Sequence, residues 1–372
     1  TPCGTLFPYT TLFRSQQYFD LGEEYLIKYK FDSARHYLEA SSEIYRSLED
    51  WEGHIKNLNK LSESYWRGFN LDKAKMYADS ALKLSLQNFG EYYRTTSNSY
   101  YNLAVVYDEK GFHSKSLKIL YKCLEIDKNL FGINSSLVAS DYESIGMAYS
   151  GIGHYNLALK YYHKCREIRE SIYGASHYKV STIYNNLSLI YRRLRLYTKA
   201  VYWSNLSNEI DSNSFDKNNW RYLNNFINDA LLYIDLNSPE KALNALNSIS
   251  YIEKNNNARG LTQLYYATFG DLYLTLNKYD SAEFFYEKSL AILNDDLHDQ
   301  YQINYLFNEI GKIKFKKQQF HEAKVKFNQV LNIGNGLGHF KYDLTNTIHL
   351  ESLSQLGDLY YTISPEHPDR KS

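Results

Sequence analysis

The sequence lacks the features that mark several large classes of protein. Only three cysteines occur in 372 residues, without CxxC spacing and without the dense, even pattern of a disulfide framework. Basic and acidic side chains number 42 each, so no excess of positive charge indicates a nucleic-acid partner. No apolar run approaches the roughly 18 residues that a membrane span needs. Sparse, unpaired cysteines predict a reducing, cytoplasmic setting.

Common catalytic and cofactor motifs are also missing. The chain contains no HExxH, no GxxxxGK[ST], no GxSxG and no GxGxxG after a strand. His163 and Cys165 stand two residues apart, but such a pair points to different faces of a helix. Cys165 repeats the position of Cys123 at a distance of 42 residues, which indicates two small, buried packing residues. We therefore predict no enzyme activity, no cofactor and no metal for this chain.

The two ends of the chain resemble translated sequencing adapter. Leu6–Ser15 reads LFPYTTLFRS, which can be back-translated to a common adapter, and Asp369–Ser372 can be back-translated to part of its reverse complement. Residues translated from an adapter are not part of the natural protein and do not contribute to its fold. We therefore expect residues 1–15 and 369–372 to be artefact, and residues 16–368 to be a piece of a longer protein.

A small residue recurs along the chain with a nearly constant period. We call these residues the anchors, and consecutive anchors are 40 to 46 residues apart. The anchors are Gly22, Ser62, Ala104, Gly146, Ser188, Ala230, Gly270, Gly311 and Gly357. A second small residue follows each of the first eight anchors at one constant spacing: Ala34, Ala74, Ser116, Ala158, Ala200, Ala242, Ala282 and Ala323.

These spacings predict a series of paired helices. A small residue on a helix A facing a small residue on a helix B lets the two backbones approach closely. Tyrosine lies three residues after eight of the nine anchors, on the same helix face, where it fills the neighbouring space. Turn residues in YDEKGF (107–112) and YLTLNKYD (273–280) separate the two helices. The single proline between residues 16 and 364 is Pro239, which suits the first turn of a helix.

The order of a small residue, a tyrosine, an alanine and an aromatic residue resembles the tetratricopeptide repeat (TPR). The usual TPR length is about 34 residues, and the longer period here resembles the kinesin-light-chain-like variant. The linkers LFGINSSLVA (130–139) and IYGASHYKVS (172–181) carry this likeness. The resemblance is weakest in the sixth and eighth repeats. It implies an all-α fold, a right-handed α-solenoid of antiparallel helix hairpins, with about eight hairpins and a partial ninth in residues 16–368.

The resemblance also implies where a partner binds. In this family the A helices line a concave groove, so residues three before and one or four after an anchor are expected to face a protein or peptide ligand. Some TPR domains hold a terminal carboxylate with a Lys/Asn clamp, which is not found here because Asn59 is followed by Glu63. The groove candidates are Asn59, Glu63, Tyr101, Asp108, Glu143, Asn185, Arg192, Asn308 and Lys312.

The arrangement of repeats is most similar to the N-terminal TPR region of bacterial TPR–CHAT proteins. In those proteins a caspase-like peptidase domain follows the repeats, so its catalytic His and Cys would lie beyond residue 368. The resemblance implies a non-catalytic scaffold that binds a protein or peptide and regulates an effector. Two alternatives stay open: the sensor region of a histidine kinase or transcription regulator, and a stand-alone adaptor.

Overall fold

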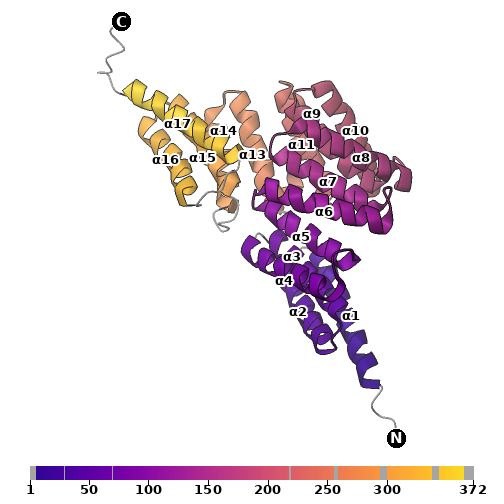
Figure 1. Cartoon of the computed structure of the whole chain (residues 1–372). Coiled ribbons are helices and arrows are strands. Elements are labelled where there is room, and N and C mark those ends of the chain that lie inside the picture. Colours follow the sequence, from indigo (N-terminus) through magenta and orange to yellow (C-terminus); the bar gives the residue numbers. More distant parts are fainter. Residues whose placement is uncertain are drawn as a thin grey trace. The chain divides into compact units, whose positions relative to one another are not determined.

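The computed structural model of the chain consists of helices throughout the part that it describes (Figure 1). Described are residues 6–28, 30–68, 70–217, 219–254, 259–293, 300–336 and 343–363. The predicted all-α class is confirmed within these ranges. The chain divides into two compact units, residues 1–172 and residues 173–372, which we call unit 1 and unit 2.

Unit 1 consists of four helix hairpins. Its helices are α1 (Leu6–Ile27), α2 (Phe31–Ser47), α3 (Trp51–Arg67), α4 (Leu71–Phe89), α5 (Arg94–Glu109), α6 (His113–Phe131), α7 (Ser136–Gly151) and α8 (Tyr155–Tyr173), the last of which ends at the boundary. Helix α1 runs without a break through residue 15, where we expected the adapter artefact to end, and the Ser41 hydroxyl donates to the Ser15 carbonyl at 2.8 Å. The artefact stays a prediction, and residues 369–372 lie outside the described part.

Unit 2 continues the same pattern. Its helices are α9 (Tyr178–Arg193), α10 (Tyr197–Ser214), α11 (Trp220–Asp235), α12 (Pro239–Ser248), the 3-10 helix η1 (Ser250–Lys254), α13 (Arg259–Thr275), α14 (Tyr279–Leu293), α15 (Gln300–Lys316), α16 (Phe320–Gly336) and α17 (Asp343–Ile363).

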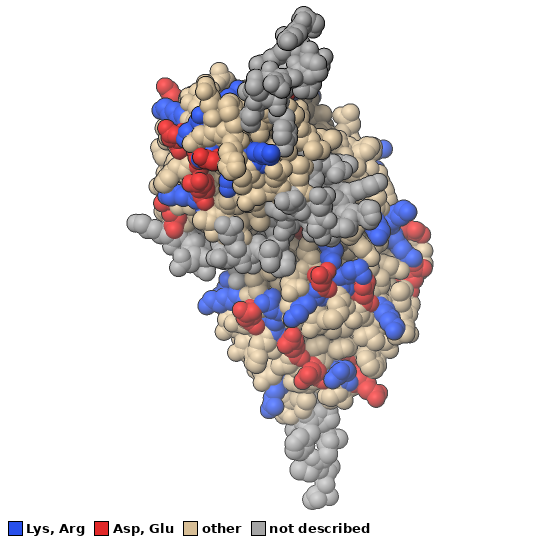
Figure 2. Space-filling model, turned by 90° about the vertical axis from the view of Figure 1, so that its left-hand side faces the viewer, with Lys and Arg blue, Asp and Glu red and all other residues tan. Residues whose placement is uncertain are grey.

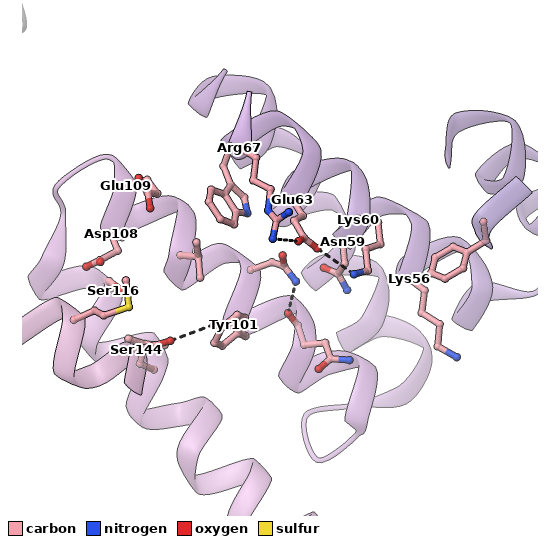
Figure 3. A pocket seen from close by; sticks show the side chains of 17 residues that line it. Lys56, Asn59, Lys60, Glu63, Arg67, Tyr101, Asp108, Glu109, Ser116 and Ser144 are labelled. Atoms are coloured by element: carbon pink, nitrogen blue, oxygen red, sulfur yellow. Dashed lines mark hydrogen bonds and ion pairs between the residues drawn. The ribbon is translucent and has the colours of Figure 1, made fainter. Parts of the chain in front are cut away.

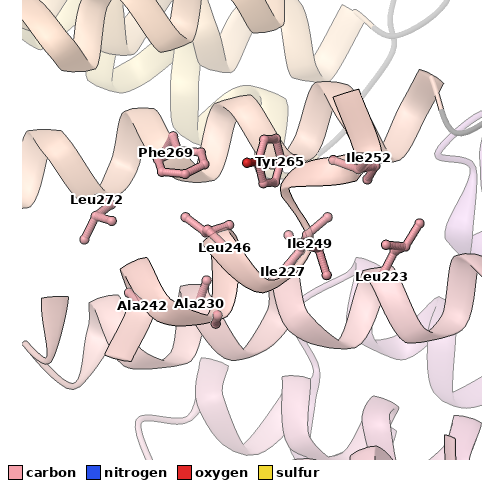
Figure 4. Close-up of a cluster of buried hydrophobic side chains, with 11 residues drawn as sticks. Leu223, Ile227, Ala230, Ala242, Leu246, Ile249, Ile252, Tyr265, Phe269 and Leu272 are labelled. Carbon is pink, nitrogen blue, oxygen red and sulfur yellow. The ribbon is translucent and has the colours of Figure 1, made fainter. Parts of the chain in front are cut away.

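The sixth hairpin departs most from the repeat. Pro239 begins α12, as predicted, and the helix spans only 10 residues. The 3-10 helix continues the apolar face, so that Ile249 and Ile252 are fully buried against Tyr265 and Phe269 (Figure 4). The short helix B explains why the resemblance is weakest here.

The predicted contact between small residues organises every hairpin. All eight second small residues, from Ala34 to Ala323, are completely buried. Where the anchor is a serine, its hydroxyl donates to the carbonyl of the second small residue, at 2.9 Å for both Ser62–Ala74 and Ser188–Ala200. The backbones of the two helices therefore approach closely enough for a side-chain hydroxyl to reach the opposite main chain.

The size of each anchor is matched by a facing residue on helix B, one turn beyond the second small residue. A Cβ built on Gly146 would lie 2.6 Å from the ring of Tyr162, and one built on Gly311 would lie 2.6 Å from the ring of Phe327. Glycine anchors face Leu, Tyr or Phe, alanine anchors face Leu, and serine anchors face Ala or Ser. The facing pairs are Gly22–Leu38, Ser62–Ala78, Ala104–Leu120, Gly146–Tyr162, Ser188–Ser204, Ala230–Leu246, Gly270–Tyr286 and Gly311–Phe327. At a glycine anchor, close packing thus leaves room for a large facing side chain that an added Cβ would meet.

The tyrosines that follow the anchors take part in the same packing between helices A and B. In several hairpins the tyrosine that follows the anchor stacks on an aromatic ring of helix B. Ring centroids lie 5.3 to 5.6 Å apart with interplanar angles of 10° or less in Tyr25–Tyr37, Tyr65–Tyr77, Tyr149–Tyr161 and Tyr273–Phe285.

The linkers from helix B to the next helix A depend on glycine in the second, third and fourth repeats. Gly90, Gly132 and Gly174 end α4, α6 and α8 with φ between 79° and 83°. Residues with a Cβ rarely adopt this conformation. Gly132 and Gly174 belong to the two linkers that resemble the kinesin-light-chain-like variant.

Gly146→Ala tests the size matching. We expect it to destabilise the chain by about 1–3 kcal/mol, because the added methyl group overlaps the Tyr162 ring. Adding Tyr162→Leu should recover part of this loss, because the pair then equals Ala104–Leu120. Urea unfolding of the two single variants and the double variant measures the coupling.

Gly260→Ala is the matched control. Nothing lies within 4 Å of a Cβ at Gly260, so this helical substitution should cost no stability. Strict additivity of Gly146→Ala and Tyr162→Leu would contradict the size matching.

Candidate functional site

A pocket of about 480 Å³ opens on unit 1 between three successive A helices (Figure 3). Helices α3 and α5 supply most of its wall, and α7 supplies Ser144 and Met147. The lining residues are Phe19, Lys56, Asn59, Lys60, Glu63, Trp66, Arg67, Asn98, Tyr101, Asn102, Val105, Asp108, Glu109, Ser116, Leu120, Ser144 and Met147.

The wall combines amide, aromatic and charged groups. Asn98 and Asn102 lie one turn apart on α5, and the Asn102 amide donates to the Asn98 carbonyl at 2.9 Å. Its charges are balanced, since three basic and three acidic side chains line it. Glu63 forms ion pairs with two of the basic groups, Lys60 and Arg67, each at 3.1 Å.

Four of the nine groove candidates line this pocket: Asn59, Glu63, Tyr101 and Asp108. Asn59 is buried, and its amide donates to the Ser99 hydroxyl at 3.0 Å while its carbonyl oxygen has no partner. Tyr101 accepts a hydrogen bond from Ser144 at 3.2 Å, and burial raises its pKa to about 12. Asp108 contacts the ring nitrogen of His113 at 2.7 Å.

The fifth candidate in unit 1, Glu143, lies outside the pocket lining. It is paired with Arg169 of α8 at 2.6 Å, and both side chains are largely buried. Burial acts to lower the pKa of Arg169, but the attraction of Glu143 and smaller contributions leave this pKa raised. The ion pair of Glu143 and Arg169 thus joins α7 to α8.

The four candidates in unit 2 contact the next helix A. Asn185 accepts from Asn228 at 3.2 Å, and Arg192 is paired with Asp235 at 2.6 Å. Asn308 is fully buried between Glu351 and Ser352, at 2.9 and 2.7 Å. Lys312 bridges Glu309 and Glu351 at 2.8 and 2.6 Å.

These contacts form one recurring arrangement. A polar residue at or near a predicted groove position reaches the following helix A about one period later, as in Asn59–Ser99, Tyr101–Ser144 and Arg192–Asp235. Apart from the Asn59 carbonyl oxygen, these hydrogen-bonding groups are therefore engaged within the chain, where the contacts to the next helix A fix the register of neighbouring hairpins. Sequence position alone could not distinguish such a contact from a ligand-binding group.

The sequence rule missed half of the stripe that faces the pocket. On both α3 and α5 the lining residues stand six, three and two residues before the anchor and one, four and five after it. The predicted positions, which stand three residues before and one and four residues after the anchor, form the inner half of this stripe, next to the neighbouring hairpin. The missed outer half comprises Lys56, Lys60 and Arg67 on α3 with Asn98, Asn102 and Glu109 on α5. Widening the stripe around the helix, to include the adjacent row of side chains, would have found them.

Other kinds of site gain no support in the described part of the chain. None of its helices is long and apolar enough to cross a membrane. Its His, Cys, Asp and Glu side chains form no group of three that could hold a metal ion. On the face shown in Figure 2, Lys and Arg are interspersed with Asp and Glu.

The two internal cysteines are free and buried, which confirms their interpretation as packing residues. Burial raises the pKa of the Cys165 thiol to about 12 and that of Cys123 well above its usual range. A raised pKa disfavours the thiolate, which is the nucleophilic form of a cysteine.

Solved structures share this fold at low sequence identity. A Rap protein complexed with competence and sporulation factor has a TM-score of 0.62 and 19% identity, over 76% of this chain and 75% of that chain. NprR in complex with its cognate peptide NprX has a TM-score of 0.56 and 16% identity, over 85% and 86%. BtubC (BKLC) from P. vanneervenii, at 0.51 and 19%, covers 61% of this chain and 92% of its own.

Comparison of the sequence with models of protein families identifies the repeats without reference to the structure. A search of curated proteins finds no match. One tetratricopeptide repeat model matches residues 55–129, 95–171 and 139–213, and a second matches residues 264–294. The first set coincides with the repeats whose linkers carry Gly90, Gly132 and Gly174. The chain belongs to the tetratricopeptide repeat family.

Proposed function

We propose that this chain is a non-catalytic scaffold that binds a protein or peptide segment in the pocket between α3, α5 and α7. The observation that carries the proposal is the composition of this wall, which combines a pair of asparagine amides with half-buried apolar side chains. An amide both donates and accepts hydrogen bonds, so it suits the alternating groups of an extended main chain.

The pocket offers separate places for the parts of a peptide. Asn98 and Asn102 stand one turn apart on the outer stripe of α5, where their side chains can bond main-chain groups. Trp66, Val105 and Met147 provide apolar surface for one side chain. The volume of about 480 Å³ suits a single large residue and its neighbours rather than a whole folded domain.

Two structural neighbours support a peptide or protein ligand. The NprR structure holds its cognate peptide NprX, and the Rap structure holds competence and sporulation factor. Because identity to these proteins is only 16% and 19%, the likeness extends to the fold, and the residues of the pocket carry the proposal here.

A scaffold role in a reducing, cytoplasmic setting agrees with the chemistry of the described residues. The buried thiols of Cys123 and Cys165 stay protonated, and the polar groups of Glu143, Arg192 and Asn308 are used in contacts within the chain. This supports a chain without a catalytic centre of its own.

We further propose that the scaffold is the regulatory or partner-recognition part of a larger bacterial protein with a C-terminal CHAT effector domain. The support is the resemblance of the overall arrangement of repeats to the TPR region of those proteins. The sensor region of a histidine kinase or transcription regulator is the second candidate, and a stand-alone adaptor is the third.

Replacing Asn98 and Asn102 together by alanine should weaken peptide binding at least tenfold, because each amide contributes roughly 1 kcal/mol or more to hydrogen bonding. Peptides selected on the full chain from a displayed random library serve as probes. Their affinities for the unmodified chain and for the double variant are then compared by fluorescence anisotropy.

Asn88→Ala is the matched control. Asn88 also donates to the carbonyl four residues earlier, but it is exposed and lies outside the pocket. Equal affinities for the double variant and the control would refute the pocket assignment. Charge reversal at Glu143 or Arg192 is a poor test, since it would leave Arg169 or Asp235 facing a like charge.

Reading the gene beyond residue 368 distinguishes the three candidate contexts. A CHAT effector predicts a domain with a His and Cys peptidase pair. A sensor region predicts a long coiled-coil or membrane helix followed by a kinase core or regulator domain. A stop codon soon after the repeats would contradict both and favour the adaptor.

A further inference from the structure

A buried polar cluster joins helices α9, α10 and α11 in unit 2. Ser181 donates to Oδ1 of Asp211, and the Asn225 amide donates to Oδ2 of the same carboxylate at 2.9 Å. Ser207 donates to the Ser181 carbonyl at 3.0 Å. Both carboxylate oxygens of Asp211 are therefore satisfied by neutral donors.

The same cluster occurs two repeats earlier, on α5, α6 and α7 in unit 1. Ser97 donates to Oδ1 of Asp127, as Ser181 does to Asp211. Cys123 replaces Ser207, and its thiol contacts the Ser97 carbonyl at 3.7 Å. The place of Asn225, however, is taken by Asp141. A second carboxyl group thus stands where the later cluster has an amide donor.

Both carboxyl groups of the earlier cluster are buried. Asp127 is 5% exposed and Asp141 is 2% exposed, and Oδ2 of Asp141 has no hydrogen-bond partner. Two buried carboxylates repel one another, and each would lack part of its solvation. A protonated Asp141, in contrast, carries an O–H donor in the position of the Asn225 amide.

Few other charges act on this pair. Lys128 on α6 and Arg94 on α5 favour the ionised forms of Asp141 and Asp127, respectively. Tyr101 on α5 and Cys123 on α6 face the pair as neutral groups, since their pKa values are raised by burial. On α8, Arg169 faces α7 but is paired with Glu143.

We propose that Asp127 and Asp141 share one proton at neutral pH, and that this proton makes the packing of α7 against α6 and α5 sensitive to pH. In the folded chain the protonated Asp141 substitutes for the asparagine of the later cluster. Loss of the proton places a second negative charge in the same buried space and favours opening of the junction.

The direction of the pH dependence follows from the pKa of Asp141. Burial, reinforced by Asp127, raises this pKa from 3.8 to about 8. Between these values the folded junction holds a proton that the opened junction releases. The stabilisation is complete below about pH 4 and is lost as the pH rises through about 8.

Hydrogen exchange of the full chain, followed peptide by peptide between pH 5 and 9, tests the proposal. Protection factors already account for the intrinsic pH dependence of exchange. In the unmodified chain, protection of α6 and α7 relative to α10 and α11 should fall by up to about tenfold per pH unit below pH 8. Asp141→Asn should abolish this decline and raise protection of α7 at pH 8.

Asn225→Asp is the reciprocal variant. It should transfer the same pH-dependent decline to α10 and α11, while α6 and α7 keep theirs. A decline in α6 and α7 that persists unchanged in Asp141→Asn would overturn the proposal. If Asn225→Asp fails to fold, the comparison of Asp141→Asn with the unmodified chain decides alone.

Discussion

The close approach of helix A to helix B is the constraint on which the rest of the structure depends. Eight small residues on helix B are completely buried against the anchors, and two anchor serines bond directly to the opposite main chain. This approach brings each anchor against its facing residue and, in four hairpins, places the following tyrosine on a second ring. The stacked tyrosines beside the anchors are therefore a consequence of packing.

The anchors and their spacing were sufficient to predict the hairpins, because contacts within a hairpin are local in sequence and repeat with it. The shortening of α12 was not predictable, because η1 continues the same apolar burial in a different helical geometry. The turns were predicted where they contain Gly or Asn. Arg195 and Gln318 adopt the same left-handed conformation without that signal, at φ of 59° and 60°.

The candidate site was predicted only in part for a physical reason. A polar side chain on the inner half of the stripe can face either a ligand or the following helix A. Asn308 and Arg192 make the second kind of contact, and that depends on residues one full repeat later, at Glu351 and Asp235. The outer half of the stripe carries Asn98 and Asn102, the two amides on which the proposed peptide site depends.

The volume shared between each anchor and its facing residue has a consequence for building new arrays from this chain. A helix A with a glycine anchor, such as α7, fits a helix B that carries a large ring, as α8 does with Tyr162. Helix α4 presents Ala78 at the equivalent place, and would leave a void against Gly146. Recombination at the A–B turns would thus create mismatched pairs such as this one, whereas recombination at the B–A linkers keeps every facing pair together. The natural module of this chain is the intact hairpin, cut between helix B and the following helix A.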